Sequence, residues 1–281
     1  MQGGSRLRKL VPVFLAWAPL LAVAPAGADA SRPDAAVTGY VGPGLMHYDF
    51  REYDADDRRL VKEEGWLSGL QGGLLVRRRR LSLLFEAAWY GGDVDYDGQT
   101  SAGVPIDSST DESLMDLSSN LAYVLALNGP VRWEVFAGGG FRHWQRDIEG
   151  VGTVSGLDET YRWWRGEAGL RADLRRGSDL WTVSGRFMRS FDPEVDVDFD
   201  DRFDSVTLDM GERWGWRVEA DWKHQLSERL VAGVRTFYAS WAFGRSDVEA
   251  LTRDGVPAGS VVQPRSEARE YGVALHLQRL W

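Results

Sequence analysis

Apolar and polar residues alternate with a period of two over long segments of the chain. In the segment 117–127, leucines and a tyrosine alternate with serine, asparagine and alanine. In the segment 214–223, three tryptophans, a valine and an alanine oppose four charged residues. Such alternation predicts half-buried β-strands. The polar face is unusual because arginine, glutamate and aspartate are abundant on it, in runs longer than an average strand.

Short turns alternate with longer, acidic, glycine-containing loops. The predicted short turns are Arg77–Arg80, Asn128–Pro130, Arg175–Ser178 and Gln225–Glu228. The predicted long loops are 54–59, 97–112, 148–156, 198–204 and 248–266. Together they delimit ten antiparallel strands: 37–53, 60–76, 81–96, 113–127, 131–147, 158–174, 180–197, 205–223, 229–247 and 267–281. Both termini then lie on the short-turn side.

Two architectures could use this pattern: a soluble sandwich or a transmembrane β-barrel. In a barrel the apolar face meets lipid, the charged face lines the lumen, and short turns alternate with long outer loops. Aromatic residues gather near predicted strand ends, which is typical of interfacial belts. The chain ends in the alternating segment "REYGVALHLQRLW" with an aromatic residue, Trp281. The pattern therefore favours an all-β fold, a ten-stranded antiparallel transmembrane β-barrel.

The N-terminal segment indicates export. Three basic residues precede an apolar run at 10–23, and the small residues of "APAGADA" follow it. This is the arrangement of a secretory signal peptide. We expect a signal peptide at 1–30 and an outer-membrane β-barrel domain at 31–281, in the cell outer membrane of a Gram-negative bacterium, with periplasmic termini and extracellular long loops.

The composition narrows the chemistry. The 281 residues include no cysteine, which excludes disulfides, thiolate metal sites, a cysteine nucleophile and a lipoprotein anchor. A net charge of −9 without a basic stripe argues against nucleic acid as a partner.

Charged residues on the polar face are predicted to fill the lumen. A barrel of ten strands has room for little beyond its own side chains, and an unpaired charge there is costly. We therefore expect cross-strand ion pairs and no wide pore. The expected lumen residues are Arg51, Glu86, Arg132, Glu134, Arg142, Arg165, Glu167, Arg171, Arg186, Arg217, Glu219, Asp221, Arg235, Glu270 and His276.

The stretch "WYGGDVDYDGQT" places Asp93, Asp95 and Asp97 at every second position near the outer end of the third strand. It can be a carboxylate site, a divalent-cation site or a hydrated hairpin tip. In the cation hypothesis, these three aspartates face Asp196 and Asp198, and their oxygens suit calcium. Strand parity points the acids outward, so an inward site needs a β-bulge at Gly91-Gly92.

The same stretch resembles the omptin family of outer-membrane proteases. Gly91-Gly92 followed by Val94-Asp95-Tyr96-Asp97 is similar to a family segment that carries one of two catalytic acidic pairs. The resemblance implies a catalytic role for Asp95 and Asp97. It also implies an Asp and a His after the seventh strand, but "SFDPEVDVDFDDRFD" at 190–204 contains no histidine.

These observations leave two hypotheses about function. The first is an omptin-like barrel without protease activity, with a structural, adhesive or ligand- or cation-binding role. The second is an omptin-type endopeptidase using Asp95 and Asp97, with His47 as the one plausible substitute base. No cofactor is expected apart from a divalent cation. The expected partners are outer-membrane lipid, lipopolysaccharide and the barrel-assembly machinery, which would recognise the last strand ending in Trp281.

Overall fold

The computed structural model describes residues 36–281 except 101–102, 127–129 and 201, and the expected signal peptide lies outside the described residues. Ten long strands form the wall: β1 (Ala36–Tyr53), β2 (Arg59–Arg78), β3 (Leu81–Gln99), β4 (Pro105–Ala126), β5 (Val131–Ile148), β6 (Leu157–Arg176), β7 (Asp179–Asp198), β9 (Trp214–Gln225), β10 (Leu230–Phe243) and β13 (Arg265–Leu280). Three short strands accompany them: β8 (Val206–Asp209), β11 (Glu249–Arg253) and β12 (Val256–Val261). Among the described residues, no helix is long and apolar enough to cross a membrane.

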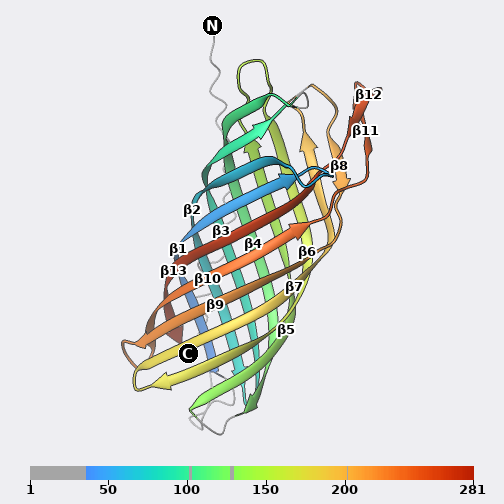
Figure 1. The fold of residues 1–281 in the computed structure, drawn as a ribbon. Helices are drawn as coiled ribbons and strands as arrows, with labels where there is room; N and C mark the ends of the chain where they lie inside the picture. The colour runs from blue at the N-terminus through green and yellow to red at the C-terminus, as the bar shows by residue number, and fades with distance from the viewer. Residues whose placement is uncertain (1–35, 101–102, 127–129, 201) are drawn as a thin grey trace.

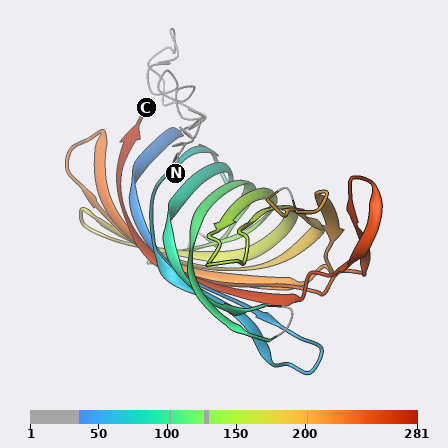
Figure 2. The ribbon, with the colours of Figure 1, turned by 90° about the horizontal axis from the view of Figure 1, so that it is seen from above.

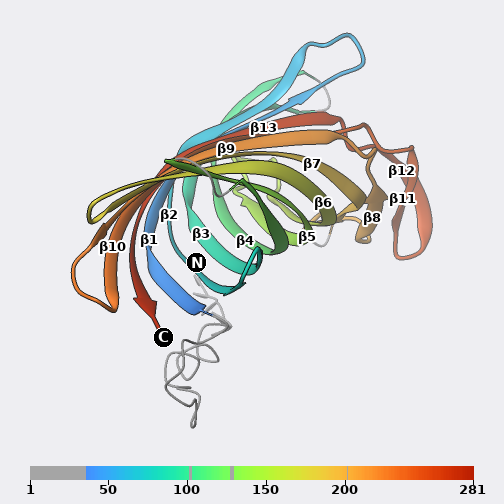
Figure 3. The same cartoon turned by 90° about the horizontal axis from the view of Figure 1, so that it is seen from below.

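The ten long strands close into a barrel (Figure 1). Each pairs antiparallel with its neighbours, and β1 pairs with β13 from Thr38↔Leu280 to Tyr53↔Arg265. The views from above and below show the strands as a continuous tilted ring (Figures 2 and 3). Closure pairs the edge strands, whose free amide and carbonyl groups hydrocarbon would not tolerate. The predicted ten-stranded antiparallel barrel is confirmed.

Three predicted boundaries are wrong. The loop expected at 97–112 is mostly strand, because β3 and β4 stay paired up to Gln99↔Pro105. The strand expected at 205–223 breaks at 210–213, where Gly211 bridges to Gly244. The loop expected at 248–266 contains the β11–β12 hairpin. In each case pairing with a neighbouring segment decided the outcome, and the local pattern does not encode it.

The wall has two zones. In the zone nearer the short turns, apolar residues face outward; Leu45, Leu121, Leu170 and Val183 are 50–60% exposed. The inward face of this zone carries charge, as predicted. A belt of exposed tryptophans, Trp66, Trp164 and Trp214, ends this zone on the side of the long loops.

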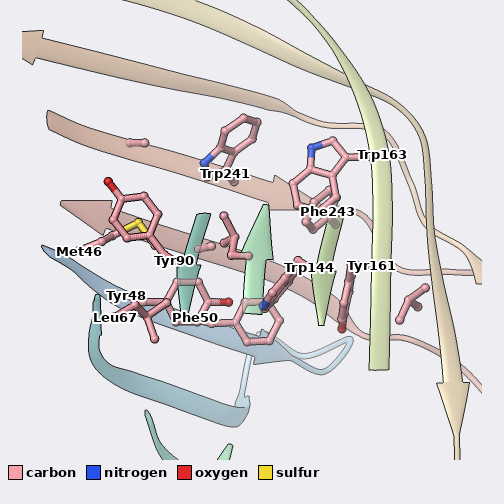
Figure 4. Packing of buried hydrophobic residues seen from close by; sticks show 14 of the residues in the cluster. Met46, Tyr48, Phe50, Leu67, Tyr90, Trp144, Tyr161, Trp163, Trp241 and Phe243 are labelled. Atoms are coloured by element: carbon pink, nitrogen blue, oxygen red, sulfur yellow. The ribbon is translucent and has the colours of Figure 1, made fainter. Parts of the chain in front are cut away.

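Beyond the tryptophan belt, towards the long loops, the polarity is reversed. Aspartates face outward, and an apolar cluster fills the interior (Figure 4). Trp144 stacks on Tyr161 with ring centroids 4.4 Å apart, and Phe50 packs edge-on against Trp144. The same alternation thus gives an inside-out barrel in one zone and, in the other, a barrel whose interior is mainly apolar and also holds a few buried charged residues.

Inward ion pairs close the lumen in the first zone. Arg165 and Arg142 both bind Asp116, at 2.7 and 2.8 Å, and Arg142 also binds Glu270. Further pairs join Arg132 to Glu134, Arg165 to Glu167, Arg186 to Glu167 and Glu219, Arg217 to Glu219, and Arg235 to Glu86 and Asp221. The central cavity among these side chains measures about 50 Å³, room for a few water molecules. The predicted plugging is confirmed for these residues.

Arg51 is an exception to the lumen prediction. Its neighbours Phe50 and Glu52 are buried in the lumen, so Arg51 lies on the outer face, where it pairs with Asp49 at 2.7 Å. The lumen prediction for Arg51 turns the wrong face of the first strand inward. In a strand, an error of one residue moves every side chain to the opposite face.

Candidate functional site

The acidic tip lies on the outer face of β3. Asp93, Asp95 and Asp97 are exposed, while Val94 between them is buried in the interior. The β3–β4 register runs without a shift from Leu81 to Gln99. The bulge at Gly91-Gly92 that an inward carboxylate site requires is therefore absent, and the three aspartates point away from the lumen.

The neighbours of these aspartates on the outer face are mostly acidic or hydroxyl-bearing. Asp95 lies opposite Glu64 of β2 and Ser109 of β4. Asp97 binds Arg59 across the hairpin at 2.5 Å. None of these contacts places a histidine beside Asp95 or Asp97. The two carboxylates have surface neighbours, as is typical of strands that face water.

The second acidic group lies on the outer face of β7. Asp196 binds Arg162 of β6 and accepts a hydrogen bond from Thr207, and Asp198 accepts one from the backbone N–H of Asp200 at 3.2 Å. Three strands, β4 to β6, separate β7 from β3 in the wall. The structure does not bring the two acidic groups together, and among the described residues no three His, Cys, Asp or Glu side chains are grouped to hold a metal ion.

In the described part of the chain, no hydrogen bond or ion pair joins a histidine to Asp95 or Asp97, although His47 contacts Glu64, which lies opposite Asp95. His47 is on the outer face, where it stacks on Tyr271 at 4.7 Å and lies 3.5 Å from Glu64. His143 alternates with the buried Arg142 and Trp144, so it also faces outward. His224 binds Asp179 at a short turn, and His276 is buried in the lumen near Asp221.

A buried charged cluster in the long-loop zone was missed by the sequence reasoning. We call it the Arg146 centre. Its members come from six segments of chain and are all less than 9% exposed: Glu52 of β1, Glu63 of β2, Thr110 and Glu112 of β4, Trp144 and Arg146 of β5, Glu159 and Tyr161 of β6, and Gln263 just before β13.

Arg146 is the hub of this cluster. Its guanidinium binds Glu63 at 2.8 Å and Glu159 more closely, and it lies 3.5 Å from Glu52 and 3.9 Å from Glu112. Phe50 adds a cation–π contact at 4.5 Å. One guanidinium therefore faces four carboxyl groups in a site closed to water.

Neutral donors satisfy part of the carboxyl oxygens. Thr110 donates to Glu63 at 2.7 Å, Tyr161 to Glu159 at 2.9 Å, and Trp144 to Glu112. The remaining Glu112 oxygen, Oε1, is buried and has no hydrogen-bond partner. Such an orphan acceptor calls for a physical explanation.

Burial is the main cause of altered acidity in this centre, which lies beyond the tryptophan belt. Glu63 is three residues past Trp66, and Glu159 five past Trp164, towards the long loops. Burial raises the pKa of Glu52 to about 7, although Arg146 opposes the shift. Burial, reinforced by the charge of Glu63, raises the pKa of Glu112 well above its usual range.

A sequence signal for this centre existed. Glu52, Glu63, Glu112 and Glu159 occupy inward positions at the long-loop ends of their strands. The loop prediction for 97–112 includes Glu112, and the lumen prediction for Arg51 turns Glu52 outward. The local pattern therefore does not group the four glutamates.

The fold matches that of a known outer-membrane enzyme. The crystal structure of the outer membrane protease OmpT from Escherichia coli superimposes with a TM-score of 0.61 at 11% identity, covering 88% of this chain and 96% of that one. The outer membrane protein AlkL matches at a TM-score of 0.37 and 12% identity, covering 92% and 95% of the two chains. The translocator domain of NalP from Neisseria meningitidis matches at 0.36 and 9%, covering 86% and 89%. These two scores are too low to support further argument.

No protein-family model matches the sequence, and the search of curated proteins also gives no match. The closed ring, strand number and OmpT superposition define the class: a ten-stranded β-barrel with an omptin-like fold. At 11% identity the likeness establishes the fold alone.

Proposed function

We propose that this protein is an outer-membrane barrel without peptidase activity, serving as a structural, adhesive or binding protein at the cell surface. The apolar outer band between tryptophan-bearing ends supports insertion in a bilayer. We assign the short turns and both termini to the periplasm, and the long loops to the exterior.

One observation carries the non-proteolytic assignment. Asp95 and Asp97 point outward from β3, and His47, a histidine on the same outer face, contacts Glu64 rather than either aspartate. Water attack on a peptide needs a positioned base of suitable pKa, worth about 10²–10⁴-fold in rate. Outward carboxylates among acidic neighbours do not provide one.

A peptidase assay tests this proposal. The protein refolded in detergent with lipopolysaccharide is incubated with fluorogenic peptides containing basic cleavage sites. We expect no cleavage above that of a heat-unfolded sample. Cleavage by the unmodified protein that is lost in both Asp95→Ala and Asp97→Ala, but kept in Asp93→Ala, would establish the endopeptidase alternative instead.

We also propose that the last strand presents the assembly signal, with Trp281 as its key residue. The Trp281 N–H donates to the Val37 carbonyl at 3.0 Å, so the terminal residue sits on the β1–β13 closure. A Cβ at Gly39 would lie 2.9 Å from the Trp281 ring, so only glycine leaves room for the indole. The lipid-facing partners are outer-membrane lipid and lipopolysaccharide.

A further inference from the structure

The long loop between β10 and β13 is tied to the Arg146 centre by one residue. The Gln263 side-chain amide donates to Glu52 Oε1 at 2.8 Å and to Tyr161 Oη at 2.9 Å. At the base of the loop, the Ser246 N–H donates to the Gln263 carbonyl, and the Gln263 N–H donates to Ser246 Oγ. Gln263 therefore joins the two ends of the loop and attaches both to the buried carboxyl groups.

The centre cannot hold all its carboxyl groups ionised. With Arg146 as the only cation in these contacts, four carboxylates would leave a net charge of −3 in a closed site. An uncompensated buried charge is so costly that such a group takes up a proton instead. Glu112 Oε1 is buried, receives no hydrogen bond and lies 3.9 Å from Arg146 Nε, so a proton fits there, and the neighbouring Glu63 carboxyl can accept it.

A second titratable oxygen is buried beside the centre. Tyr48 Oη is also without a hydrogen-bond partner, and the Tyr48 ring packs edge-on against Trp144 at 5.7 Å (Figure 4). The titratable and charged groups facing the centre are Glu52 and Tyr48 from β1, Glu63 from β2, Tyr96 from β3, Glu112 from β4, Arg146 from β5, and Glu159 and Tyr161 from β6. Only one of them is a cation, so nothing else in the set offsets the carboxylates.

We propose that the Arg146 centre is a proton-controlled latch for the long loop: Glu52 and Glu112 hold protons while Gln263 is seated, and their ionisation releases it. When Glu52 and Glu112 both ionise, their negative charges repel each other and are more stable when water reaches them. The surrounding walls are hydrogen-bonded strands, whereas Gln263 lies in an irregular segment between β12 and β13. Gln263 is thus the part that yields, and the segment 262–264 at the base of the loop loosens with it. The β11–β12 hairpin itself stays held by hydrogen bonds from Thr252, Asp254 and Gly255 to Asp204.

The direction of the pH effect follows from the raised carboxyl pKa values. The closed state binds protons that the open state releases, so the latch is fully stable below the ordinary glutamate pKa of 4.5 and weakens as pH rises through about 7. The base of the loop is therefore held at acid pH and loosened at alkaline pH. The latch does not depend on whether the barrel has peptidase activity.

Site-specific labelling can test the latch, because the chain contains no cysteine. A spin label on Val262→Cys, the half-buried neighbour of Gln263, reports the mobility of the segment 262–264 in liposomes from pH 5.5 to pH 9. We expect an immobilised label at pH 5.5 and a mobile one at pH 9. The Glu52→Gln/Glu112→Gln double variant should stay immobilised at pH 9, because glutamine imitates the protonated acid.

Glu64→Gln is the matched control, since Glu64 neighbours Glu63 but faces outward and is exposed on its side chain by 41%. It should keep the transition of the unmodified protein. A label whose mobility ignores pH, or a control that loses the transition as completely as the double variant, would overturn the latch. Infrared spectra of the unmodified protein give an independent check: a protonated-carboxyl band present at pH 6 should lose intensity by pH 9, and its absence at pH 6 contradicts the proposal.

Discussion

At the scale of single residues, the effect of an arginine–carboxylate ion pair on the free energy of unfolding depends on its burial. Arg146 and its carboxylates are almost wholly enclosed, whereas the Arg189–Glu212 pair lies on the surface with side chains 47% and 36% exposed. Removing one partner of a buried pair leaves an uncompensated charge and costs about 3–5 kcal/mol. An exposed pair contributes about 0–1 kcal/mol.

Arg146→Met should therefore destabilise the barrel by about 3–5 kcal/mol at pH 8. The loss should shrink at pH 5, because Glu52 and Glu112, whose pKa values burial raises, are then protonated and part of the charge that Arg146 offsets is gone. Urea unfolding of the refolded protein at both pH values measures the effect. Arg189→Met is the control, expected to change stability by less than about 1 kcal/mol; equal losses in the two variants would show that burial of the pair is irrelevant.

At the scale of strands, the outer face of the long-loop zone carries a row of aspartates in register. Asp93 lies opposite Asp111, Asp111 opposite Asp147, Asp147 opposite Asp158, and Asp158 opposite Asp198. Like charges directly across an antiparallel pair are unfavourable by about 0.2–1 kcal/mol. Where Asp93 faces Asp111, this repulsion works against the pairing of β3 with β4 beyond the tryptophan belt.

Asp93→Asn should stabilise the barrel by a few tenths of a kcal/mol, by removing one charge from the end of this row. The gain should fall as salt is raised to about 1 M, where the screening length is about 3 Å. Thermal unfolding at low and high salt provides the measurement. Asp97→Asn serves as the comparison, because it also loses the ion pair with Arg59; a loss of stability in Asp93→Asn at low salt would refute the repulsion.

At the scale of the whole molecule, the barrel is a closed body in both zones. Ion pairs fill the membrane-facing zone around a central cavity of about 50 Å³ and a second cavity of about 180 Å³ nearer the short turns. An apolar cluster and the Arg146 centre fill the zone above it. Both fillings come from the same inward positions, so neither zone provides a continuous path for ions.

The unmodified protein should therefore show no large, stable conductance in planar bilayers. The double variant Arg142→Ala/Arg165→Ala should leak cations, because it opens space around Asp116 and Glu270 while leaving their charge. Single-channel recording at neutral pH distinguishes the two. Large openings of the unmodified barrel would mean that the ion-pair plug moves and that the protein is a channel.

The alternation of apolar and charged residues determined the strand number, the antiparallel order and most of the lumen. A period of two predicts strands with one apolar and one charged face. When the charged face lines a narrow barrel, its side chains form ion pairs because an unpaired buried charge is costly. Arg165, Glu167 and Arg186 were predictable on this basis, because their neighbours along the strand show plainly which face is apolar.

Only the tertiary structure decided the rest. Whether Asp95 points into a cleft depended on a bulge that pairing with β4 does not contain. The Arg146 centre depended on closure, which gathers Glu52, Glu63, Glu112 and Glu159 from strands far apart in sequence around one guanidinium. Local periodicity reports which face a residue occupies, whereas the meeting of charges across a lumen depends on strand order, register and height. These are set by the pairing of the whole ring.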